Sequence, residues 1–168
     1  MGVYSIWLML EQDSRSSYRD LIIKLSKKLK TPSFDPHCTL YGRLDLDIDQ
    51  IRPTVIDLVK TKNQFSTNVK RLKTGKTKWK SLYLALDNKE DLRYLYGACK
   101  KQFGSLRKYA FDPHLSIAYG IFDPESIHYA TKNIKIPEYL SFSAIAIVKT
   151  GENIVDWEIV FQRQFENG

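Results

Sequence analysis

The chain has 168 residues, 43% hydrophobic and 27% charged, with a formal net charge of +7. This composition is ordinary for one globular domain covering residues 1–168. It excludes a membrane-spanning helix, because no stretch approaches ~20 consecutive apolar residues, and the apolar opening is a poor secretory leader, because no basic residue precedes it. Two cysteines and no Asn-x-Ser/Thr site argue against a disulfide-stapled secreted domain. We therefore expect a monomer in a reducing compartment, the cytoplasm or the nucleus, with no membrane partner.

The first half of the chain has the periodicity of two strands and two helices. Apolar residues alternate in the strand patterns and recur at helical spacing between them. The predicted elements are a strand at 3–10, a helix at 14–30 capped by Ser14, Ser16 or Ser17, a short strand at 37–42 ending at a glycine, and a helix at 49–62 with Pro53 in its first turn.

The second half repeats this order after a hairpin, and it ends in another hairpin. The first hairpin has strands at about 64–73 and 79–87 around a basic turn, KTGKTK. The later elements are a helix at 88–104 stopped by Gly104, a strand at 114–120, a helix at 123–133 with Asp123 as cap and Pro124 at its first position, and strands at 139–150 and 153–165 joined at Gly151 and Glu152. The pattern predicts a single α+β domain of two pseudo-symmetric lobes.

Two short segments, SFDPHCTL at 33–40 and AFDPHLSI at 110–117, repeat the frame Phe-Asp-Pro-His. Residues i and i+2 of a strand share a face. His37 and Thr39 therefore point together, as do His114 and Ser116. Each motif presents one imidazole beside one hydroxyl, and a repeated frame in matching places argues for function rather than for two structural histidines.

Two imidazoles facing one cleft suit acid–base hydrolysis of a phosphodiester. A neutral imidazole takes a proton from water, and a protonated one gives a proton to the departing alkoxide; both forms exist near an unperturbed pKa of ~6.5. The two hydroxyls can donate hydrogen bonds to the non-bridging phosphate oxygens. This chemistry requires no metal and no cofactor.

These motifs resemble those of the 2H phosphoesterase superfamily, and the chain is most similar to its cyclic nucleotide phosphodiesterases of plants and yeast. The resemblance implies antiparallel sheets with helices packed outside, an active-site cleft between the lobes, and metal-independent catalysis. By position it implies catalytic roles for His37, Thr39, His114 and Ser116. It also implies that Trp7 and Tyr119 flank the nucleotide, as aromatic rings that stack on a base or ribose.

The sequence leaves three functions open. The preferred one is hydrolysis of a small nucleotide substrate, either a 2',3'-cyclic nucleotide or ADP-ribose 1'',2''-cyclic phosphate. The second is an RNA-directed enzyme, a 2'-5' phosphodiesterase or an RNA-end processing activity, which the basic stretch 70–80 favours. The third is a binding module without catalysis. The motifs do not indicate base preference, nor which histidine is the base.

Other residues receive structural interpretations. His128 lacks a hydroxyl partner in register and is interpreted as a surface or packing residue. TGKT at 74–77 is not a phosphate-binding loop, because Lys70 occupies the position of the required glycine. Cys38 is interpreted as a small buried hydrophobe. Three scattered histidines predict no metal site.

Overall fold

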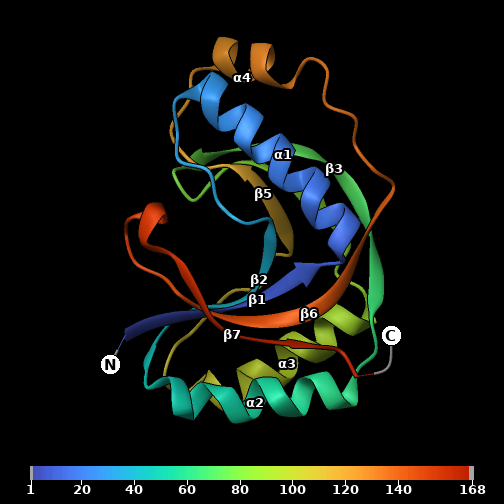
Figure 1. The fold of residues 1–168 in the computed structure, drawn as a ribbon, viewed down its shortest axis with the longest axis vertical. Coiled ribbons are helices and arrows are strands. Elements are labelled where there is room, and N and C mark those ends of the chain that lie inside the picture. Colours follow the sequence, from blue (N-terminus) through green and yellow to red (C-terminus); the bar gives the residue numbers. More distant parts are fainter. Residues whose placement is uncertain (1, 167–168) are drawn as a thin grey trace.

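The computed structural model describes residues 2–166 as strands, helices and their connections (Figure 1). The elements, in chain order, are β1 (Gly2–Leu10), α1 (Gln12–Leu29), β2 (His37–Leu46), α2 (Ile48–Thr61), β3 (Phe65–Thr77), β4 (Lys80–Leu86), α3 (Glu90–Phe103), β5 (His114–Ala118), α4 (Pro124–Thr131), β6 (Tyr139–Lys149), the single 3₁₀ turn η1 (Ile154–Asp156) and β7 (Glu158–Gln164).

The strands form an antiparallel sheet in the order β2-β1-β6-β3-β4-β5, with β7 also paired to β6. The long strand β3 joins two parts of this sheet. Its first residues pair with β6 and its last residues pair with β4. The two lobes are thus β2, β1, β6 and β7 on one side and β4 and β5 on the other. This arrangement confirms the predicted α+β class.

The helices cover the two lobes in pairs (Figure 1). Helix α1 packs against β5 and α4, whereas α2 and α3 pack against each other and against β6 and β2 respectively. Helix α1, from the first half of the chain, therefore covers a strand of the second half. Helix α3, from the second half, covers a strand of the first half. The repeated halves seen in the sequence interleave, so the lobes do not coincide with consecutive halves of the chain. Among the described residues, no helix is long and apolar enough to cross a membrane.

Both helices of the first half begin earlier than predicted. The N-cap of α1 is Glu11, whose carboxylate accepts a hydrogen bond from the Ser14 N–H at 2.9 Å, and not one of the three serines. Asp47 caps α2 through a capping box. As a result, Pro53 lies beyond the first turn and not within it. Both helices therefore begin where a side-chain oxygen just ahead of the apolar periodicity accepts a hydrogen bond from a backbone N–H of the first turn.

Three strand boundaries also differ from prediction. Strand β2 does not end at Gly42 but runs on to Leu46, through a bulge opposite β1. Strand β3 continues through the predicted turn KTGKTK to Thr77, so the chain reverses at Lys78 and Trp79 instead. The final strand begins only after η1. In the first two cases cross-strand pairing outweighed local turn residues such as glycine, whereas in the third a 3₁₀ turn occupies the predicted start of the strand.

The core lies mainly between the sheet and the helices, and β1 divides its side chains between two faces. Ile6 and Leu8 are fully buried in the main core. Trp7 and Met9 belong to a second, smaller cluster with β6 on the opposite face. The alternation of β1 thus places Trp7 on the face that carries the cavity described below.

Candidate active site

The two histidines meet in one cavity of about 470 Å³ between the lobes. His37 is the first residue of β2 and His114 is the first residue of β5, and these two strands lie against each other. Each histidine follows an Asp-Pro pair, which keeps the entry to the strand extended. The structure therefore brings together the two motifs that the sequence repeated.

Both imidazoles have the same tautomer. His37 Nδ1 lies 2.6 Å from the Asp35 carbonyl oxygen, and His114 Nδ1 lies 2.7 Å from the Asp112 carbonyl oxygen. A carbonyl oxygen only accepts, so Nδ1 carries the proton in each ring. Each neutral histidine consequently has its basic lone pair on Nε2, the nitrogen that remains for a reaction partner.

The surroundings of the two rings differ. His37 is 3% exposed, and its ring stacks on Trp7 with the centroids 3.4 Å apart and the planes 5° from parallel. Burial lowers the pKa of His37 to about 3, an effect that the Asp35 carbonyl opposes and a charge on His114 reinforces. Burial also lowers the pKa of His114, whose side chain is less enclosed.

The two hydroxyls also lie in different settings. Thr39 is half-buried and lines the cavity. Ser116 is 2% exposed; its Oγ makes no hydrogen bond of ordinary geometry among the described residues, although it lies close enough to the Tyr119 hydroxyl to oppose the rise that burial causes in the pKa of that group. A buried hydroxyl without a partner costs about 1–3 kcal/mol. Thr39 is therefore placed to reach a ligand in the cavity, whereas Ser116 is not among the residues that line it.

Aromatic side chains form one wall of the cavity. Trp7 and Tyr119, the two predicted contacts, both line it, although one face of Trp7 is covered by His37. Sequence reasoning missed Trp79 and Trp157, which stack with centroids 5.7 Å apart and planes 22° apart. All three tryptophans of the chain line this cavity. The sequence did contain a signal for these two residues, because each tryptophan stands in an otherwise polar turn, where an apolar ring has no core to pack into.

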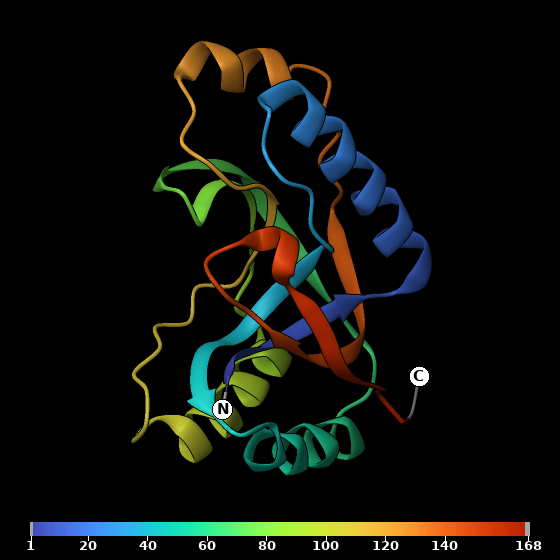
Figure 2. The same cartoon turned by 60° about the vertical axis from the view of Figure 1, so that its left-hand side comes forward.

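The chain reversal between β3 and β4 reaches the cavity through a contact with the second motif. The Gly120 N–H donates to the Lys78 carbonyl at 3.0 Å, which places Trp79 edge-on to Tyr119. Gly120 has a φ of +151°, and a Cβ there would lie 2.6 Å from the ring of Phe122. Glycine is therefore required at this close approach. In Figure 1 the β3–β4 reversal (green) and the η1 segment (red) both lie on the left-hand side of the molecule, which Figure 2 turns toward the viewer.

The remaining candidates lie apart from this cavity. His128 is exposed on α4. Cys38 is fully buried, as predicted, and burial raises the pKa of its thiol to about 12. Within residues 2–166, no group of three or more His, Cys, Asp or Glu residues has the arrangement to hold a metal ion.

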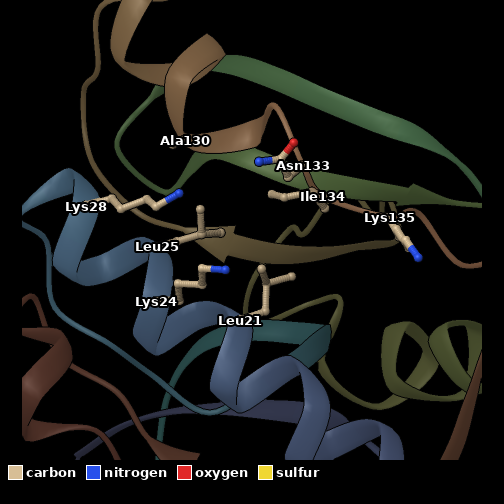
Figure 3. A pocket seen from close by; sticks show the side chains of 8 residues that line it. All are labelled: Leu21, Lys24, Leu25, Lys28, Ala130, Asn133, Ile134 and Lys135. Atoms are coloured by element: carbon tan, nitrogen blue, oxygen red, sulfur yellow. The ribbon is translucent and has the colours of Figure 1, made fainter.

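A second hollow lies between α1 and the segment after α4 (Figure 3). Lys24 and Lys28 of α1 and Lys135 surround an apolar floor that includes Leu25 and Ile134. It contains neither an imidazole nor a hydroxyl. The hollow therefore has none of the groups that the two-histidine chemistry requires.

A sequence model of the 2'-5' RNA ligase superfamily matches residues 31–153, a range that includes both histidine motifs. The chain belongs to this superfamily. This assignment confirms the predicted 2H phosphoesterase membership.

A curated relative is consistent with this assignment. The cyclic phosphodiesterase of Arabidopsis thaliana is 24% identical over 117 residues, which cover 70% of this chain and 65% of that protein. The matched region is thus slightly less than two thirds of that relative's length. Together with the superfamily match, this similarity supports the predicted cyclic phosphodiesterase-like branch.

The fold is shared with solved structures at low sequence identity. A Thermus thermophilus protein has a TM-score of 0.67 at 11% identity, covering 98% of both chains. Escherichia coli LigT, solved in complex with 3'-AMP, has a TM-score of 0.61 at 11% identity, again covering 98% of both chains. These similarities establish the fold.

Proposed function

We propose that the protein is a metal-independent hydrolase that opens a cyclic phosphodiester to a phosphomonoester. The substrate is a 2',3'-cyclic nucleotide or ADP-ribose 1'',2''-cyclic phosphate. The observation that carries the proposal is the pair of imidazoles of one tautomer in one cavity, together with the hydroxyl residue Thr39 that lines the same cavity. The relationship to a cyclic phosphodiesterase supports the same reaction.

His37 is the general base in this proposal and His114 the general acid. Because burial against Trp7 disfavours the charged form of His37, its Nε2 is free to accept a proton from water. As the water oxygen bonds to phosphorus, the bond from phosphorus to one ring oxygen breaks. The negative charge of the bound phosphate offsets the effect of burial and favours protonated His114, which gives its Nε2 proton to that leaving oxygen; solvent exchange then restores both rings.

The hydroxyls and the aromatic wall have separate roles. Thr39 and Ser116 donate hydrogen bonds to the non-bridging phosphate oxygens, whose charge rises toward the transition state. Tyr119 and Trp7 contact the nucleoside, together with the stacked pair Trp79 and Trp157. The cavity volume of about 470 Å³ lies in the range of small-molecule sites.

One observation favours the RNA-directed alternative. The exposed Lys78 lies at the chain reversal beside the cavity, with its Nζ 4.7 Å from the centroid of the Trp79 ring. Lys76 is exposed in the same hairpin. Positive charge at the cavity mouth suits a polymer with several phosphates. An RNA ending in a 2',3'-cyclic phosphate is therefore the second candidate substrate.

The deciding experiment offers the purified protein each candidate substrate in excess chelator, with products identified by phosphorus NMR. We expect turnover of a small cyclic phosphate to one phosphomonoester, and the position of that phosphate identifies the bond that breaks. Preference for the RNA by more than about tenfold in kcat/KM would favour the alternative. Activity lost to the chelator and restored by a divalent ion would contradict the metal-free mechanism.

A further inference from the structure

The cavity extends beyond the histidines to a second polar end. This far end is lined by the side chains of Ser5, Arg43, Thr150 and Glu152. None of these residues has a part in the acid–base chemistry above. Arg43 is the cation among them, and within residues 2–166 no carboxylate lies within 4.0 Å of its guanidinium.

A bulge in β2 places Arg43 at this end. Ile6 pairs with Tyr41 and Tyr4 pairs with Leu44, so Gly42 and Arg43 together oppose a single residue of β1. Arg43 has a φ of 59°, a conformation that is uncommon for residues other than glycine. Bulges near active sites redirect side chains, and strained backbone persists where the surrounding structure holds it.

The bulge is held by specific contacts. The Arg43 N–H donates to Ser5 Oγ at 3.1 Å, and Ser5 Oγ lies 3.1 Å from Thr150 Oγ1. Ser5 is only 5% exposed. On the neighbouring residue, a Cβ at Gly42 would lie 3.2 Å from the Tyr109 ring, which also lines the cavity. These contacts fix the backbone of the bulge, and the Arg43 side chain is exposed at this end of the cavity, where a ligand can reach it.

We infer that Arg43 binds a second phosphate group of the substrate, separated from the cyclic phosphate by the nucleoside. The inference rests on the proposed function. Arg43 follows His37 by six residues along β2, roughly 20 Å of extended strand at ~3.3 Å per residue, so there is room for a nucleoside between the two positions. A guanidinium binds phosphate with two parallel hydrogen bonds. The carboxylate of Glu152 repels an anion, so the second phosphate lies on the Arg43 side of the far end.

The test compares 2',3'-cyclic AMP with the same nucleotide carrying a 5'-phosphate. We expect the wild type to favour the 5'-phosphorylated substrate by about tenfold or more in kcat/KM, the range for a charge-assisted hydrogen bond. Arg43→Asn removes the charge and keeps a residue that tolerates positive φ, and it should bring this ratio close to one. Arg43→Lys keeps the charge without the planar fork and should give an intermediate ratio.

The matched control is Lys30→Asn. Lys30 is the other non-glycine residue with positive φ, at 55°, and it caps the C-terminus of α1 outside the cavity. This variant loses the same charge in the same backbone conformation, so its ratio should equal that of the wild type. Equal ratios in wild type and Arg43→Asn would overturn the inference, as would an equal fall in Lys30→Asn.

Two further arms locate the second phosphate and separate this inference from the proposed function. A cyclic nucleotide with a 5'-pyrophosphate and a dinucleotide with a terminal cyclic phosphate distinguish the sources of the group.

Binding of adenosine 3',5'-bisphosphate and 3'-AMP, followed by fluorescence of the three cavity tryptophans, needs no turnover. If no cyclic phosphate is hydrolysed, the proposed function fails, but tighter bisphosphate binding that Arg43→Asn abolishes still supports the Arg43 site. Equal binding of the two ligands overturns it.

Discussion

The two histidine motifs share one backbone frame but lie in different surroundings. His37 is enclosed by the Trp7 ring, and the preceding carboxylate, Asp35, is held by Arg15 and Arg19. His114 meets Tyr83 edge-on, with ring centroids 5.2 Å apart.

The carboxylate before the second histidine is also held differently. Asp112 is bound by Lys80 alone, and its side chain is 71% exposed. The common frame sets a common tautomer, whereas the unequal burial sets unequal proton affinities. In the proposed mechanism, this difference lets a duplicated motif supply both a base and an acid.

The largest expected effect is the loss of either imidazole. His37→Gln and His114→Gln should each lower turnover of 2',3'-cyclic AMP by at least ~10²-fold, the low end for losing a general base or acid. The control is His128→Gln, which removes the third histidine on the exposed face of α4 and should leave turnover at the wild-type value. Near-wild-type turnover in either motif variant would show that its histidine is not catalytic.

The pH dependence of the residual activity sharpens this comparison. In the wild type, kcat/KM should be bell-shaped, because one ring must be neutral and the other protonated. A base loses activity as the pH falls, so His37→Gln should lose the acid-side limb. His114→Gln should lose the alkaline-side limb for the opposite reason. If His37→Gln instead loses the alkaline-side limb and His114→Gln loses the acid-side limb, then His114 is the base and His37 is the acid.

Loss of either hydroxyl should reduce turnover no more than loss of an imidazole, and the two substitutions should differ in their effect on stability. Thr39→Val and Ser116→Ala should each reduce turnover about 10²-fold, or ~3 kcal/mol, as expected for one preorganised donor. Ser116→Ala also removes a buried hydroxyl without a partner, so the free energy of unfolding should rise by about 1 kcal/mol. Thr39→Val should show no such gain.

Steady-state kinetics and urea unfolding measure the two quantities. A rise in the Michaelis constant with unchanged turnover would show that the hydroxyls hold substrate without stabilising the transition state. A loss of stability in Ser116→Ala would indicate that its hydroxyl has a partner in solution.

The buried His37 should make the folded protein acid-sensitive. Its pKa falls from 6.5 to about 3 on folding, so below pH 6.5 the unfolded chain binds a proton that the folded chain does not. Because of this difference in proton binding, the free energy of unfolding is unaffected by His37 above pH 6.5 and falls by about 1.4 kcal/mol per pH unit as the pH decreases from 6.5 toward 3.

Urea unfolding at pH 7.5 and pH 5.0 tests this effect. His37→Gln should lose about 2 kcal/mol less than the wild type between these values. His114→Gln should also lose less free energy of unfolding than the wild type over this pH range, but the difference should be smaller than for His37→Gln, since His114 is less enclosed. Equal pH dependence in the wild type and His37→Gln would contradict the burial of a neutral ring.

The smallest effect concerns the carboxylates before the two histidines. Burial alone would raise the pKa of Asp35, but the hydrogen bonds and charges of Arg19 and Arg15 outweigh it and hold that pKa below its usual value. Asp35→Asn should lower the free energy of unfolding by about 1 kcal/mol. The exposed Asp112 should contribute less than about 0.5 kcal/mol in the matched Asp112→Asn variant. Equal losses would show that the two ion pairs do not differ.

Most of the architecture could be predicted from local pattern. Strand and helix periodicities repeat every two or 3.6 residues along the chain, so they are readable without contacts. The same geometry placed His37 beside Thr39 and His114 beside Ser116. The boundaries that failed, at Gly42 and at the turn KTGKTK, lie where pairing with a neighbouring strand overrode the local preference of glycine.

By itself the sequence determined the fold class, the order of elements and the residues of the two motifs, because these depend on neighbours a few positions apart. Only the tertiary structure decided the difference between the motifs, since the stacking of Trp7 on His37 depends on the register of β1 against β2. It also decided which distant residues enter the cavity. Trp79, Trp157 and Arg43 arrive there through a chain reversal, a 3₁₀ turn and a bulge, and contacts between residues so far apart in the chain have no signature in local periodicity.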